Sequence, residues 1–242
     1  MISELTNPPI TEVVCGFILN PTPLTTLDFG VYREMRVSDF QRSELHPPVM
    51  DGVGFQLGPM IDARVWLISH NEELLVQLQG DRVYVNWRRR GEHYPRFHDH
   101  GEQNGIKRQA IDEYKKFASF AKSRGIENLS IVRLELAKIN ILKKGIDYKN
   151  TSELCELIRF AGDFERVCMS SLQQFELRFI EGDQIKSSHV AISMTQNQVQ
   201  LEIRHTFPFS DDLDSAFSAA NELVNKQFFN LLDVNRLEEI RL

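Results

Sequence analysis

Residues 74–87, LLVQLQGDRVYVNW, constrain the fold more than any other segment of this sequence. Two runs of alternating apolar and polar residues flank the pair Gly80-Asp81, a combination typical of a two-residue β-hairpin turn. A turn at this pair places Leu78 opposite Val83, and the same register makes one face of both strands apolar and the other polar. The segment therefore predicts an antiparallel strand pair whose polar face is open to water.

A second segment, residues 189–207, repeats this construction with a turn at Gln196-Asn197. After each hairpin, apolar residues recur at helical spacing, first in residues 106–125 and then in residues 210–233. Both stretches predict amphipathic helices with one apolar stripe each. The stripes are Ile106, Ala110, Tyr114, Phe117, Ala118 and Ala121 in the first helix, and Leu213, Phe217, Ala220, Val224, Phe228 and Leu231 in the second.

An isolated strand is predicted before each hairpin, at residues 12–19 and at residues 129–142. The connections that follow these strands differ in character. Residues 20–62 are rich in Pro and Gly, whereas residues 150–162 predict a helix that begins with a capping box. The order of strand, connection, hairpin and helix thus occurs twice along the chain.

This order predicts an α+β fold, in which an antiparallel sheet is built from two strand–hairpin–helix pseudo-repeats with the long helices packed on one face. The two halves would be residues 1–126 and residues 127–242, joined in one compact unit that shares a sheet. A chain of 242 residues is long enough to bury a core without disulfide or metal support.

Three motifs carry a resemblance to a known family: NPPI followed by EVV near the start, LLVQLQGDRVYVNWRR followed by YPRF, and the helical segment LDSAFSAANELVNKQFFNLL. On these motifs the chain resembles a sporadically distributed prokaryotic family that has no assigned activity. The resemblance implies a bacterial or archaeal origin and a place in accessory genome content, such as defence or conflict systems. It implies no catalytic residue.

Composition narrows the class of protein. The formal net charge of −6 is opposite in sign to that of a typical duplex-DNA-binding protein, so any nucleic-acid surface would be a local patch. Three cysteines without CxxC spacing argue against a disulfide framework or a thiolate zinc site, and favour the reducing cytoplasm. No signal-peptide pattern opens the chain and no apolar run approaches the roughly 20 residues of a membrane span, so we expect no membrane partner.

Residues 85–100, VNWRRRGEHYPRFHDH, form the most unusual local composition. They contain His93, His98 and His100, which offer imidazole ligands, but no HExxH or paired-cysteine pattern reinforces a metal site. We therefore expect a strand end followed by a solvated loop, with no metal and no cofactor. Neither a phosphate-binding glycine loop nor a nucleophile elbow occurs in the sequence.

Arginines alternate with other polar residues on the predicted polar sheet face and continue into the loop at residues 88–96. Guanidinium groups grip carboxylates and phosphates in a bidentate manner, and a neighbouring aromatic ring can stack on a ligand. The alternative is that interleaved Arg and Glu form cross-strand pairs in water without any ligand. The candidate binding residues are Arg82, Tyr84, Arg88, Arg89, Arg90, Arg96, Arg133 and Arg204.

Two functions follow. The first is a non-enzymatic interaction protein that holds a protein partner, or a protein–nucleic acid partner, through this face and loop. The second is a phosphate-handling enzyme for a nucleotide or nucleic acid, in which Glu12, Glu135 or Glu202 would act as acid, base or metal ligand. Self-association of a hairpin edge into a homodimer is a further alternative.

Overall fold

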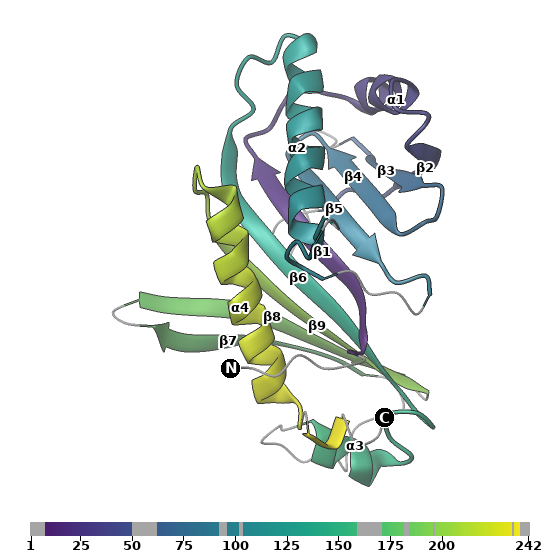
Figure 1. Ribbon diagram of the computed structural model, residues 1–242, viewed down its shortest axis with the longest axis vertical. Helices are drawn as coiled ribbons and strands as arrows, with labels where there is room; N and C mark the ends of the chain where they lie inside the picture. The colour runs from purple at the N-terminus through teal and green to yellow at the C-terminus, as the bar shows by residue number, and fades with distance from the viewer. Residues whose placement is uncertain are drawn as a thin grey trace. The chain divides into compact units, whose positions relative to one another are not determined.

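The chain is an α+β protein, as a computed structural model shows for residues 8–49, 62–91, 96–101, 104–158, 171–181, 184–195, 197–233 and 235–237. Hydrogen-bonded strands follow the order β2-β3-β4-β5-β1-β6-β9-β8-β7 (Figure 1). The pairs β2–β3, β3–β4, β4–β5, β7–β8 and β8–β9 are antiparallel. The predicted α+β class and antiparallel sheet are confirmed.

The elements have the following bounds. The strands are β1 (Ile10–Leu19), β2 (Phe40–His46), β3 (Arg64–Ser69), β4 (Leu74–Gln79), β5 (Arg82–Arg88), β6 (Ile131–Lys143), β7 (Ser171–Glu181), β8 (Gln184–Met194) and β9 (Gln198–Pro208). The helices are α1 (Thr26–Glu34), α2 (Ile106–Ser123), α3 (Thr151–Leu157) and α4 (Leu213–Leu231).

The chain divides into two compact units. The β2–β5 unit comprises Val14–Glu135 and Phe207–Ala216, and the β7–β9 unit comprises Met1–Val13, Leu136–Thr206 and Phe217–Leu242. Strands β1 and β6 each contribute residues to both units. The predicted halves have other boundaries, and a repeat that relates them stays a prediction.

Both predicted hairpins have the expected register. In β4–β5, Leu78 pairs with Val83 and Leu74 pairs with Trp87. In β8–β9, Met194 pairs with Val199, and the alternation of buried and half-buried residues continues along β9. The structure thus confirms both registers. They could be predicted because the turn and the apolar face specified the same pairing independently.

The connection at residues 20–62 holds more structure than its composition indicated. It contains helix α1 and strand β2, and β3, which was not predicted, follows it. Helix α1 begins at a capping box between Thr25 and Asp28. The glycines at positions 52, 54 and 58, which were interpreted as part of this loop, lie outside the described residues.

Aromatic rings join α1, α2 and β1 in the core of the β2–β5 unit. Phe17 of β1 stacks on Tyr114 of α2 with ring centroids 4.4 Å apart. Tyr32 of α1 contacts Phe117 edge-on at 5.6 Å. The stripe predicted for α2 is buried except at Ala118, which is half-buried, and Gly125 just beyond the helix has a φ of +87°. A left-handed residue at this position is the usual glycine stop.

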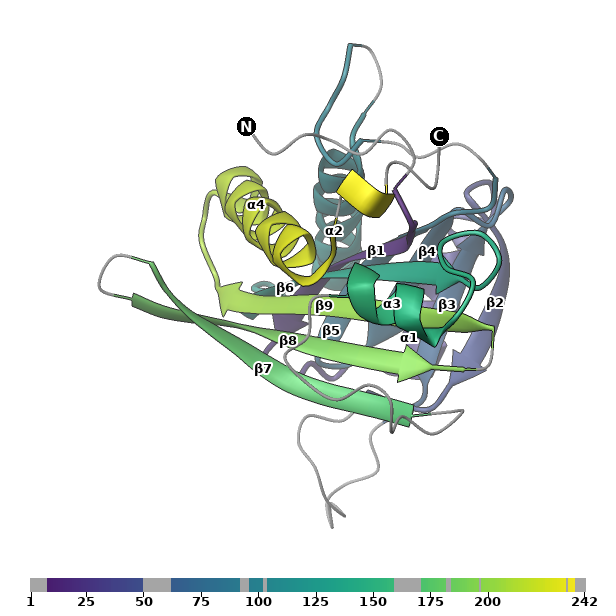
Figure 2. The same cartoon turned by 90° about the horizontal axis from the view of Figure 1, so that it is seen from below.

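The β7–β9 unit contains three long neighbouring strands (Figure 2). Its buried residues include Val190 and Ile192 of β8 and Leu201 of β9. Asn150 caps α3, because its side chain accepts a hydrogen bond from the Glu153 amide at 3.0 Å. This cap was predicted; the last residues assigned to that helix, 159–162, lie outside the described residues.

Candidate functional site on the arginine face

One face of the β2–β5 unit carries some of the predicted arginines together with arginines that were not predicted. The strand registers place His46 opposite Arg64 and Trp66 opposite Gln77, so alternate residues of the four strands lie on a common face. We call this surface the arginine face: Arg42, Arg64 and Arg88 lie on it, and Arg90 continues it directly after β5.

Two of the predicted binding residues are not on an open surface. Arg82 is 2% exposed and Tyr84 is 4% exposed, so the expectation that the polar face of β4–β5 is solvated is wrong at these positions. Arg82 donates to both carboxylate oxygens of Asp81, at 3.0 and 2.7 Å. The Tyr84 ring lies directly over Gly16 of the neighbouring strand β1.

The chain after β2 explains part of this burial. The Gln79 side chain accepts a hydrogen bond from the Val49 amide at 2.8 Å and donates to the Val49 carbonyl at 3.0 Å. On the same face, Gln77 donates to Asn86 at 3.0 Å. The amide side chains that looked solvent-facing in sequence therefore satisfy buried hydrogen bonds instead.

Arginines converge on Glu72, in the turn between β3 and β4. Arg42 donates to the Glu72 carboxylate, and Arg90 lies 3.3 Å from its other oxygen. Arg88 donates to the Glu72 main-chain carbonyl at 3.1 Å. The hydrogen bond from Arg42 is the main cause that holds the pKa of Glu72 below its usual value. The carboxylate and the main-chain carbonyl of Glu72 thus organise three arginines from β2 and from the end of β5.

Arg64 is in a different situation. No salt bridge joins it to a carboxylate within the part of the chain that the structure describes, although its side chain is half-buried. Its guanidinium lies over the Trp66 ring, 5.3 Å from the centroid, and the His46 ring stacks on Trp66 at 3.7 Å. Burial lowers the pKa of Arg64, because no nearby carboxylate offsets the loss of hydration.

Polar atoms without hydrogen-bond partners surround this stack. Arg64 Nε, Trp66 Nε1 and Gln77 Oε1 are buried and have no partner among the described residues. Buried polar groups of this kind are rare in native proteins and call for a specific explanation. Two donors, one acceptor and an uncompensated cation at adjacent register positions form a local environment suited to an anionic group.

The other predicted residues are distributed as follows. Arg89 donates to the Gly91 carbonyl at 3.0 Å, and Arg96 is exposed. Arg133 is half-buried on β6. Arg204 belongs to the β7–β9 unit, where it pairs at 2.6 Å with Glu202, two residues earlier on the same strand.

The histidine-containing loop shows no convergence of ligands in the described residues. His98 and His100 are exposed, and His93 lies outside the described part. Across the described ranges, no group of three or more His, Cys, Asp or Glu side chains is placed to hold a metal ion.

Sequence reasoning missed Arg42, Arg64, Trp66, His46 and Glu72. In the β2 segment FQRSELH, four consecutive polar residues separate Phe40 from Leu45, so no alternation of apolar and polar residues indicated a strand. The prolines that follow it also favoured a loop. The position of Glu72 depends on the pairing of β3 with β4, which periodicity alone does not reveal.

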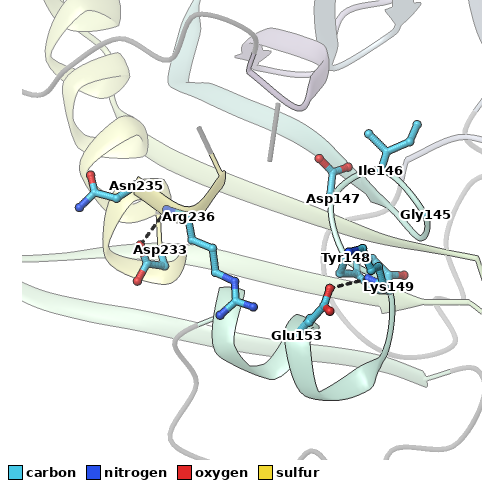
Figure 3. Close-up of a pocket in the computed structure, with 9 residues that line it drawn as sticks. All are labelled: Gly145, Ile146, Asp147, Tyr148, Lys149, Glu153, Asp233, Asn235 and Arg236. Carbon is cyan, nitrogen blue, oxygen red and sulfur yellow. Dashed lines mark hydrogen bonds between the residues drawn. The ribbon is translucent and has the colours of Figure 1, made fainter. Parts of the chain in front are cut away.

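A cavity of about 580 Å³ lies in the β7–β9 unit (Figure 3). Its carboxylates support local backbone: Glu153 accepts from the Lys149 amide at 2.8 Å, and Asp233 accepts from the Arg236 amide at 3.2 Å. The Arg236 side chain pairs with Glu156. These polar groups are used by the turns that carry them, so the cavity is a weaker candidate than the arginine face. It is lined by Gly145, Ile146, Asp147, Tyr148, Lys149, Glu153, Asp233, Asn235 and Arg236.

Comparison with protein-family models gives no match for this chain, and comparison with curated protein sequences gives none either. Among the described helices, none combines the length and the apolar character that crossing a membrane requires.

Proposed function

We propose that this chain is a non-enzymatic interaction protein that binds an acidic segment of a protein partner through the arginine face. The observation that carries the proposal is Arg64, a half-buried guanidinium that has no carboxylate partner among the described residues and lies on an aromatic ring. A role in prokaryotic defence or conflict systems, which the family resemblance implies, belongs to the same proposal.

The energetics of Arg64 favour a ligand over a purely structural role. Removing a charge from water is unfavourable unless an opposite charge or hydrogen bonds compensate for the lost hydration. A carboxylate from a partner would supply the missing charge beside the half-buried Arg64 guanidinium. Arg88 and Arg90 lie toward the opposite end of the same strands, and would attract an acidic segment during its approach despite the net charge of −6.

The substitution Arg64→Met separates binding from stability. Methionine keeps an extended apolar side chain on the Trp66 ring but removes the uncompensated charge. We expect the thermal unfolding midpoint to stay the same or to rise, because a desolvated cation is lost. We expect affinity for a fluorescent Glu- and Asp-rich peptide to fall at least tenfold, as measured by anisotropy titration.

The control for net charge is Lys115→Met, which removes one positive charge from the exposed face of α2. It should leave peptide affinity within about twofold of wild type, since surface charges away from the contact are weakly coupled to it. A labelled single-stranded oligonucleotide serves as the second probe. If the oligonucleotide binds more tightly than the peptide, the ligand of the arginine face is nucleic acid and not an acidic protein segment. A drop in the unfolding midpoint of Arg64→Met without any loss of affinity would show that Arg64 is structural.

A further inference from the structure

Apolar exposure in this protein is concentrated in one short segment. Five of the eight large hydrophobic residues that are exposed in the described chain lie within residues 27–45, and the other three are scattered. The five are Leu27, Val31, Met35, Val37 and Leu45; the other three are Val132, Ile146 and Phe209. Contiguous exposed apolar surface on a globular protein usually marks an interaction site.

Helix α1 contributes a stripe to this segment. Leu27, Val31 and Met35 follow one another at intervals of four, so they lie on one side of the helix and continue just past its end. The side of α1 toward the core is already occupied, because Phe29 and Tyr32 are buried there. The helix is therefore apolar on two sides, and among the described residues one of these sides is packed while the other is exposed.

Strand β2 contributes an open edge. It is the terminal strand of the sheet, and no strand in the described residues pairs with its outer side (Figure 1). Leu45 of β2 is 67% exposed. An edge strand with unpaired main-chain groups is a template for another strand, and proteins usually blunt it with charges, prolines or bulges. In β2 a bulge lies between Phe40 and Arg42, and Pro47 follows the last residue, which limits any added pairing to this one strand.

The charges of β2 are arranged in a self-complementary way. In an antiparallel pairing of two β2 strands centred on Ser43, Arg42 of each copy lies opposite Glu44 of the other, and Gln41 lies opposite Leu45. A register centred on Glu44 instead would place that carboxylate against its own copy, which is unfavourable. Arg42 and Glu44 pair with each other at 3.0 Å within the strand, but their side chains are still 42% and 39% exposed, so both can also reach a partner strand.

We propose that two copies of this chain associate through their β2 edges, antiparallel about Ser43. The same register brings Leu45 of one copy to Gln41 of the other. The Gln41 carbonyl accepts from Arg33, so the end of α1 lies next to β2. The interface is isologous, with the Arg42–Glu44 and Gln41–Leu45 contacts each repeated about a two-fold axis. This inference does not rest on the function proposed for Arg64.

The test is a charge exchange, read out as the mass of the full chain by sedimentation equilibrium over a wide concentration range. Wild type should dimerise. Arg42→Glu and Glu44→Arg should each weaken dimerisation about tenfold or more, because each places like charges opposite one another twice in the interface. The double variant Arg42→Glu/Glu44→Arg should restore dimerisation to within about threefold, since the pairs are then reversed but complete.

Three further measurements keep this test sharp. Arg42 also contacts Glu72 within the chain, so circular dichroism melts should show that each variant is folded. Leu45→Asp changes no charge pair and should also dissociate the dimer. Arg108→Glu, a reversal of an exposed arginine on α2, should leave dimerisation unchanged. A monomeric wild type at all concentrations would overturn the proposal, and so would a double variant no better associated than the single ones.

Discussion

Gly16 of β1 shows how the absence of a side chain lets a neighbouring ring approach the main chain. A Cβ atom at this position would lie 2.6 Å from Cε1 of Tyr84 and 3.0 Å from the Cβ of Glu135. We expect Gly16→Ala to lower the free energy of unfolding by ~1–3 kcal/mol, because the buried Tyr84 ring has little room to move. Urea denaturation measures the change. The matched control is Gly30→Ala in α1, where a Cβ meets nothing within 4 Å and alanine should stabilise the helix by ~0.5–1 kcal/mol. Equal effects of the two substitutions would contradict this account.

The stability of the protein is expected to depend on pH through the carboxylate of Asp28. Its carboxylate accepts from the Thr25 amide at 3.0 Å and from Arg124 at 2.6 Å, and these contacts, led by the Thr25 amide, hold its pKa below the ordinary value of 3.8. A carboxyl whose pKa is lower in the folded state stabilises the fold above its unfolded pKa. That stabilisation is lost as the pH falls through the folded value.

We therefore expect Asp28→Asn to be less stable than wild type at pH 7, and the difference to disappear at a pH below the lowered pKa of Asp28. Urea denaturation of both proteins across this pH range makes the comparison. A difference that is the same at pH 7 and at pH 2 would mean that the charge of Asp28 contributes nothing to stability.

At the scale of residues, the sequence correctly predicted which side chains share a face of a strand, but not which of them are exposed to solvent. Alternation correctly assigned Arg82 and Tyr84 to the polar face of the first hairpin, yet both are buried. Periodicity reports only which side chains share a face; what covers that face depends on distant segments, such as the main chain at Val49 that bonds Gln79. The converse holds for Arg64, whose lack of a carboxylate partner appears only in three dimensions.

At the scale of elements, α4 offers a test of a predicted start. Asp212 accepts from the Ser215 amide at 3.0 Å and from the Ser215 hydroxyl at 2.6 Å, directly before the helix. We expect Asp212→Ala to destabilise the protein by ~1 kcal/mol, the usual value of a lost helix cap. The neighbouring Asp211, exposed and outside this cap, is the control, and Asp211→Ala should change stability by less than about 0.5 kcal/mol. If both alanine variants unfold at the same urea concentration, the cap assignment is wrong.

The elements that were predicted share a property that the missed ones lack. Each hairpin combined a turn signal with an alternating pattern, so two independent signals agreed, and each long helix showed an apolar stripe at helical spacing. Strand β2 has exposed or half-buried residues at every position after Phe40, and therefore carries little of the apolar signal on which strand prediction depends. Its partner β3 was missed with it.

At the scale of the whole molecule, the fold class followed from order and periodicity, whereas the candidate site did not. Arg88, Arg89 and Arg90 are adjacent in sequence and were found together. Arg42 and Arg64 join them only because β2, β3, β4 and β5 are neighbours in the sheet. The order of the strands in the sheet decides which arginines share a surface. This order could not be predicted from the sequence.

The most direct test of the account is a comparison of tagged wild type with Arg64→Met in pull-downs from the native host, each with and without nuclease. We predict that wild type captures a protein in stoichiometric amount, that nuclease does not release it, and that Arg64→Met captures it at least tenfold less while remaining folded. Equal capture by both proteins would remove the arginine face as the binding site. An empty eluate from wild type would contradict the interaction function itself.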